Sequence, residues 1–78
     1  MDVIDSVFDA MRKADLKPGE PIFIIRGQDA AAPDAIRNYG MQAEHAGASV
    51  DFLAEVSRRE QEFREWQRIN ESLVKIPD

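Results

Sequence analysis

The sequence predicts a mainly helical fold of the α+β class, in the order helix, strand, helix, helix, whose lone strand pairs with a second subunit. Two observations predict this order. Apolar residues recur at helical spacing in three segments, and a β-branched and aromatic run lies between Pro21 and Gly27. The chain has 78 residues, enough for a single domain over residues 1–78. A domain this small buries a thin core and needs reinforcement.

The first helix is predicted from Asp2 to Leu16. Asp2 suits the positive end of the helix dipole and Lys13 the negative end, and Pro18 with Gly19 stops the segment. Its apolar stripe consists of Val3, Ile4, Val7, Phe8, Met11 and Ala14.

Residues 21–27 predict a strand, because the run Pro-Ile-Phe-Ile-Ile-Arg-Gly is apolar without alternation, as in a strand covered on both faces. No second strand is visible, and each backbone group left buried and unpaired costs about 1 to 3 kcal/mol. An antiparallel strand can pair with its own copy across a two-fold axis. We therefore expect a homo-oligomer, a dimer or larger, held by Ile22 to Ile25 and by the apolar stripe of the last helix. The alternative is a buried extended segment wrapped by helices.

Two further helices are predicted on either side of Gly47. Asp29 caps a turn and Pro33 opens the first of them, whereas Ser49 caps the second, which runs until Pro77. The inward positions of the first are mostly small, so another element can pack close: Ile36, Tyr39, Gly40, Ala43 and Ala46. The stripe of the second is Phe52, Leu53, Val56, Phe63, Trp66, Ile69 and Leu73, with ion pairs at Glu55–Arg59, Glu60–Arg64 and Glu71–Lys75. Residues 75–78 are expected to form a disordered tail.

Composition excludes several classes of function. Fifteen acidic against ten basic residues give a formal charge of −5, which disfavours broad nucleic-acid binding. Without cysteine and with one histidine, His45, the chain offers no disulfide framework and no zinc site, so we expect no metal and no cofactor. No apolar run approaches a membrane span and the first residues are acidic, so we expect a protein of the cytoplasm that does not bind membranes.

One polar stretch favours a ligand site. Arg26, Gln28 and Asp29 follow the strand and lead into a helix start, where free N–H groups favour anions. The predicted ligand-binding set is Arg26, Gln28, Asp29, Arg37, Asn38 and Tyr39, and its ligand is a small anion such as a nucleotide. The alternative is structural: Arg26 pairs with Asp29 on the surface, and Asp29 caps the turn.

Catalytic machinery is not recognisable, so we predict that the chain is not an enzyme. His45 has no accompanying nucleophile, and Glu60, Glu62 and Glu65 fit a solvated helix face. Phe63 and Trp66 fit a core or a subunit interface, or alternatively a platform on which a base stacks.

The order of strand, helix and helix, with Gly47-Ala48-Ser49 between the helices, resembles the ribbon-helix-helix repressors over about residues 21–66. That resemblance implies a dimer that reads DNA with the outward side chains of its strand. Here those side chains are mostly apolar, which disfavours DNA binding.

A second resemblance is to small uncharacterised proteins of phages and prophages. It rests on the apolar strand, Arg26-Gly27-Gln28-Asp29, Ala32-Pro33, an aromatic residue at Tyr39 and Glu65-Trp66-Gln67, and it covers about residues 21–67. It implies a phage protein of the host cytoplasm that counters host defence as an oligomer, by sequestering a nucleotide signal or by binding a host protein. The first function hypothesis is therefore sequestration of a small anionic ligand. The second is a protein interaction module that docks through its long last helix.

Overall fold

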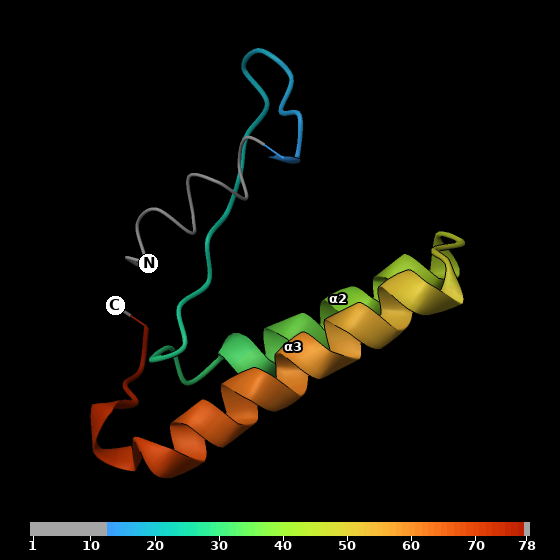
Figure 1. Ribbon diagram of the computed structural model, residues 1–78. Helices are drawn as coiled ribbons and strands as arrows, with labels where there is room; N and C mark the ends of the chain where they lie inside the picture. Colours follow the sequence, from blue (N-terminus) through green and yellow to red (C-terminus); the bar gives the residue numbers. More distant parts are fainter. Residues whose placement is uncertain (1–12, 78) are drawn as a thin grey trace.

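The computed structural model describes residues 13–77, and their main feature is a helical hairpin (Figure 1). Helix α2, Ala32–His45, and helix α3, Val50–Ile69, lie antiparallel and side by side. A short 3-10 helix, η1, follows at Glu71–Leu73. The predicted helical character is confirmed, but the described residues contain no sheet, so the predicted lone strand is wrong for the single chain.

Local signals place the turn between the two helices as predicted. Gly47 adopts a φ of 93°, a left-handed conformation that favours glycine, and the chain reverses there. The hydroxyl oxygen of Ser49 accepts a hydrogen bond from the Phe52 N–H at 3.1 Å, which caps α3. Pro33 lies in the first turn of α2, where its missing N–H is not needed.

Helix α3 ends at Ile69, well before Pro77. The backbone and side-chain amides of Asn70 both donate to the Trp66 carbonyl at 2.9 Å, which satisfies an acceptor at the helix end. The helix therefore has 20 residues and a length of about 30 Å, shorter than the predicted helix that runs until Pro77. Two of the predicted ion pairs form on it, Glu55–Arg59 and Glu60–Arg64. Because Glu71 and Lys75 lie beyond its end, they do not form the predicted pair on a continuous helix.

The C-terminal segment returns to the loop that precedes α2. Lys75 and Asp29 form an isolated parallel bridge, in which the Ala30 N–H donates to the Lys75 carbonyl and the Lys75 N–H donates to the Gln28 carbonyl, both at 2.9 Å. Lys75, at the start of the predicted tail, thus forms one wall of the region around Gln28 and Asp29.

Residues 20–26 run as an open chain toward the hairpin (Figure 1). Within the described part of the chain, no backbone group of residues 21–25 donates or accepts a hydrogen bond. A strand requires a hydrogen-bonded neighbour, and the described residues supply none. The alternative of a buried segment is also wrong, because Ile22, Phe23 and Ile24 are 46%, 87% and 59% exposed.

The predicted helix from Asp2 to Leu16 lies mostly outside the described residues. Lys13 is helical, but Ala14 and Asp15 form a turn, so the helix ends before Leu16. Asp15 has a φ of 52°, a left-handed conformation that does not continue a helix.

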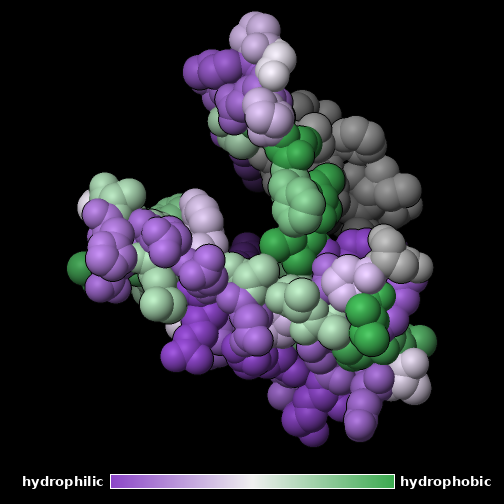
Figure 2. All heavy atoms as spheres, turned by 180° about the vertical axis from the view of Figure 1, so that it is seen from behind, coloured by the Kyte–Doolittle hydropathy of each residue, from purple (hydrophilic) through white to green (hydrophobic). Residues whose placement is uncertain are grey.

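Little of the described chain is buried. Ala32 and Pro33 are its only buried residues. The total accessible surface is 6573 Å², whereas a compact folded monomer of 8.8 kDa exposes about 4,800 Å². The radius of gyration of 13.8 Å likewise exceeds the roughly 11.5 Å of a compact chain of this length. Figure 2 shows hydrophobic side chains gathered at the surface along the segment that leads to the hairpin.

The close contact between Gly40 of α2 and Val56 of α3 allows the packing of the two helices to be tested. A Cβ at Gly40 would lie 3.3 Å from the Val56 Cγ1, tighter than an ordinary contact. We expect Gly40→Val to lower the free energy of unfolding by about 1 to 3 kcal/mol by forcing α2 and α3 apart, although valine favours a helix more than glycine does. Urea denaturation at one fixed protein concentration measures the change. Ala35→Val, at an exposed position of α2, is the matched control, and equal midpoints for the two variants would contradict the packing.

Candidate functional site

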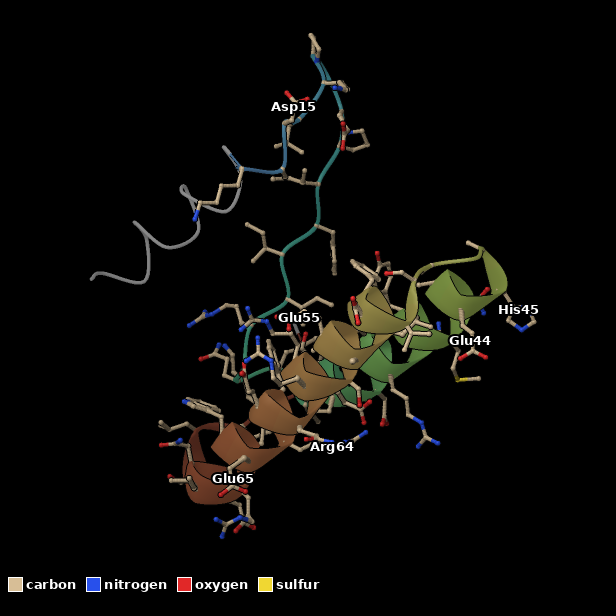
Figure 3. The ribbon with its side chains drawn as sticks, turned by 45° about the vertical axis from the view of Figure 1, so that its right-hand side comes forward. Asp15, Glu44, His45, Glu55, Arg64 and Glu65 are labelled. Atoms are coloured by element: carbon tan, nitrogen blue, oxygen red, sulfur yellow. The ribbon has the colours of Figure 1, made fainter. Side chains whose placement is uncertain are left out.

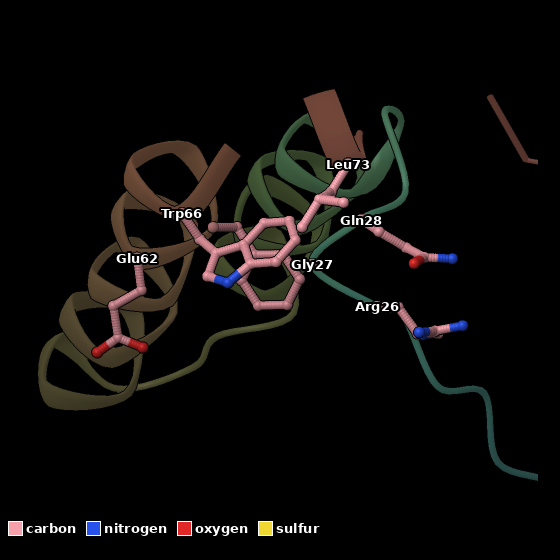
Figure 4. Close-up of a pocket in the computed structure, with 7 residues that line it drawn as sticks. Arg26, Gly27, Gln28, Glu62, Trp66 and Leu73 are labelled. Atoms are coloured by element: carbon pink, nitrogen blue, oxygen red, sulfur yellow. The ribbon is translucent and has the colours of Figure 1, made fainter. Parts of the chain in front are cut away.

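A cavity of about 540 Å³ lies at the end of the hairpin farthest from Gly47, between α3, η1 and the chain before α2 (Figure 4). Its lining combines aromatic, aliphatic and polar side chains: Arg26, Gly27, Gln28, Glu62, Phe63, Trp66 and Leu73. Two members of the predicted ligand-binding set, Arg26 and Gln28, belong to it. Phe63 and Trp66, for which a stacking role was an alternative, form its aromatic side.

Trp66 supports the loop that carries the polar residues. A Cβ at Gly27 would lie 3.6 Å from the indole, which is ordinary contact distance, so the loop backbone packs against the ring. The Trp66 side chain is still 38% exposed. In Figure 4 the indole lies beside Gly27, and the side chains of Arg26 and Gln28 extend away from it in a common direction.

Gln67, the next residue on α3, fixes the same loop. Its side-chain amide donates one hydrogen bond to the Gly27 carbonyl at 2.9 Å and another to the Asp29 carbonyl at 2.7 Å. The group is partly buried, so it replaces water as the partner of the Gly27 carbonyl, and it gives the Asp29 carbonyl a second donor beside the Ala32 N–H. Sequence reasoning did not assign Gln67 to the site, although the resemblance to phage proteins included it in Glu65-Trp66-Gln67.

Asp29 has a structural role. Its carboxylate accepts a hydrogen bond from the Ala31 N–H at 2.8 Å, and its carbonyl accepts one from the Ala32 N–H at 3.0 Å. The predicted cap is thereby confirmed. The alternative pairing of Asp29 with Arg26 does not form: within residues 13–77, Arg26 has neither an ion-pair nor a hydrogen-bond partner for its side chain.

Arg26 and Gln28 also line a second, smaller cavity of about 220 Å³ on the other side of the loop. Ile24 lies on the same side, as expected when alternate residues of an extended chain share a face. Lys75 and Pro77 of the C-terminal segment complete the wall with Asp29. Arg26 therefore lines two hollows, one that includes Phe63 and Trp66 and one that includes Asp29 and Lys75.

The structure does not bring Arg37, Asn38 and Tyr39 to this site. Tyr39 lies against Phe52, edge to face with ring centroids 6.3 Å apart, beside a separate hollow at the hairpin turn. Arg37 lines a hollow between α2 and α3, and Asn38 is exposed on α2. In Figure 3 His45 lies at the opposite end of the hairpin from Glu65.

Charged side chains along α3 form ion pairs with one another. Arg58 binds Glu62 at 2.8 Å, and its hydrogen bond to Glu55 lowers the pKa of that carboxyl. Arg68 lowers the pKa of Glu65 in the same way, through a hydrogen bond to its carboxylate. These pairs are solvated and contribute little stability.

One ion pair links the two helices. Arg64 binds Glu60 at 2.8 Å and Asp34 of α2 at 3.0 Å. Glu60, Glu62 and Glu65 are thus each engaged by an arginine. Glu65 is solvated as predicted, whereas the Glu60 side chain is only 19% exposed and Glu62 lines the cavity.

Among the described residues, no cluster of histidine, aspartate and glutamate is arranged to hold a metal ion. The helices of that part of the chain are also too short or too polar to cross a membrane. Comparisons of the chain with known protein families, with curated proteins and with solved structures found no match. Its function is therefore argued from the cavity itself.

The two hydrogen bonds of the Gln67 side chain can be tested with a substitution that keeps its size and removes its donor. Gln67→Glu places a carboxylate against two carbonyl oxygens and removes both hydrogen bonds. The Gly27 carbonyl is then left unsatisfied, at a cost of about 1 to 3 kcal/mol, whereas the Asp29 carbonyl keeps the Ala32 N–H. We expect faster amide hydrogen exchange over residues 27–30 and a changed Trp66 emission spectrum. Gln61→Glu, exposed on the same helix, is the matched control. Protection of residues 27–30 that is equal in both variants would contradict the role of Gln67.

Proposed function

We propose that this chain is a non-enzymatic binding protein for a small anionic ligand with a planar aromatic part, of which a nucleotide is the obvious example. One observation carries the proposal: a guanidinium without a partner and a partly exposed indole line one cavity. The volume of about 540 Å³ lies within the range of small-molecule sites.

The aromatic part and the phosphate of such a ligand would contact different residues of the cavity. A nucleobase would stack on Trp66 or Phe63, a contact worth about 1 to 3 kcal/mol per base. A phosphate would receive charge-assisted hydrogen bonds from Arg26 and a neutral one from the Gln28 amide. Glu62, which also lines the cavity, is engaged by Arg58 and Arg59, so its repulsion of an anion is reduced.

Phage origin and action against host defence follow from the resemblance of the motifs around Arg26 and Trp66, and ligand sequestration agrees with them. The DNA-binding alternative needs a strand whose outward side chains reach the bases, and residues 22–25 offer only apolar side chains for such contacts. The alternative of an interaction module would use the apolar stripe of α3, on which Phe52, Trp66 and Ile69 are exposed, and it stays the second candidate.

Titration of the protein with mononucleotides, linear dinucleotides and cyclic dinucleotides tests the proposal, with Trp66 as the single tryptophan reporting by fluorescence. We expect at least one class to quench the emission. Arg26→Ala should weaken binding about 10- to 100-fold, since a hydrogen bond to a charged group contributes about 1.5 to 3 kcal/mol.

Arg37→Ala is the matched control, because Arg37 also lacks an ion-pair partner within the described residues but does not line the cavity. We expect its affinity within about twofold of the parent chain. Absence of quenching and of calorimetric heat with all three ligand classes would refute the proposal. Equal losses in both arginine variants would show a general charge effect and would refute the site.

A further inference from the structure

The segment before the hairpin is an open backbone edge with apolar side chains. Within the described residues, none of the backbone groups of residues 21–25 is paired, and Phe23 is almost wholly exposed. Such an edge is a template for a second strand, and native proteins cover it, shorten it or charge it. A charged residue flanks this edge at each end, Glu20 before it and Arg26 after it, and the residues between them are Pro21 and four apolar residues.

The exposed apolar side chains of this edge favour a partner that covers them. Ile22, Phe23 and Ile24 are 46%, 87% and 59% exposed, and burial of apolar area is the main driving force of protein association. A second copy is always present at the concentration of the first, and a two-fold axis makes one edge complementary to itself.

The position of Pro21 selects the edge that pairs. In an antiparallel pair, N–H groups of alternate residues point toward the neighbouring strand. Proline lacks an N–H, so the ladder is complete only if Pro21 and the residues that share its direction, Phe23 and Ile25, point away from the neighbour. Ile22 and Ile24 then face it, and each can exchange two backbone hydrogen bonds with the other copy.

The two charges select the register. With the two-fold axis at Phe23, Ile22 of one copy lies opposite Ile24 of the other, and Glu20 lies opposite Arg26. Both ends of the ladder then carry a cross-strand ion pair of opposite charges, a favourable arrangement. Shifting the axis to Ile22 or Ile24 would separate Glu20 from Arg26.

We propose that two copies of this chain pair antiparallel through residues 20–26, about a two-fold axis at Phe23, with Glu20 of each copy bound to Arg26 of the other. The exposed Phe23 ring of each copy lies beside the Phe23 ring of the other copy, and this contact removes both rings from water. Arg26 lies at the boundary between the copies, and its five N–H donors suffice for a carboxylate on one side and a ligand on the other. This pairing does not depend on the proposed ligand, because it rests on the backbone edge and on the charges that flank it.

Charge exchange tests the register, with sedimentation velocity from about 1 to 100 µM as the measurement, since association depends on concentration. The parent chain should sediment as a dimer or a larger species. Glu20→Arg and Arg26→Glu should each weaken association at least tenfold, and the double variant should restore it to within about threefold of the parent. Glu44→Arg and Arg37→Glu make the same charge changes on α2 and should leave association unchanged.

A cross-link tests the axis independently. The chain has no cysteine, so Phe23→Cys introduces a single thiol. Opposite residues of a non-hydrogen-bonded pair are about 4.5 Å apart at Cα, within the range that a disulfide spans. Mild oxidation should therefore give a covalent dimer, whereas Val50→Cys, at a position 81% exposed, should not.

Three outcomes would overturn the proposal: a folded monomer of the parent chain at 100 µM, single charge variants that associate as tightly as the parent, or equal cross-linking of both cysteine variants. Loss of ligand binding with an intact dimer would instead refute only the proposed function. A dimer in which the double charge variant is not restored would place the contact elsewhere and refute this register.

Discussion

Two helices that pack side by side bury only the stripe along their line of contact, and this geometry governs the described part of the chain. The contact between α2 and α3 is close where Gly40 meets Val56, but it covers little apolar surface, and Ala32 with Pro33 are the only buried residues. The hydrophobic effect is proportional to the area removed from water, so this contact alone provides little stabilisation. The remaining apolar side chains need a cover from outside the hairpin.

The candidate site is fixed by the few tertiary contacts that the hairpin makes. Gln67 binds two carbonyls of the loop at residues 27–29, the Trp66 ring lies under Gly27, and the bridge at Lys75 holds the other side of the loop. All three contacts act on the backbone. Arg26 and Gln28 are thus presented from a held loop while their side chains stay exposed, which is the arrangement that a binding site requires.

The sequence predicted features whose cause lies within a few residues, and it failed where the cause is distant. Gly47 and Ser49 act on their own neighbours, so the hairpin turn followed from them. The end of α3 depends on the hydrogen bonds of Asn70 to the Trp66 carbonyl, whereas the apolar stripe continues past Asn70 to Leu73 and therefore predicted a longer helix. Arg37 to Tyr39 were grouped with Arg26 by closeness in sequence, but α2 carries them along its axis at about 1.5 Å per residue and into other hollows. The strand predicted at residues 21–27 does not form because the described residues contain no second strand to pair with it.

Arg26 connects the two proposals, and thermodynamic linkage decides how they influence each other. The residue ends the open edge and lines the cavity, so a ligand phosphate and a carboxylate of a second copy would both approach its guanidinium. If both fit at once, each changes the affinity of the other by the same factor, because coupling between binding events is reciprocal. If they exclude each other, ligand drives the copies apart by that factor. The planar fork of arginine can bind oxyanions on separate edges, whereas a lysine ammonium is a single point of charge. Arginine at position 26 is therefore compatible with simultaneous binding of a ligand phosphate and of a carboxylate from a second copy.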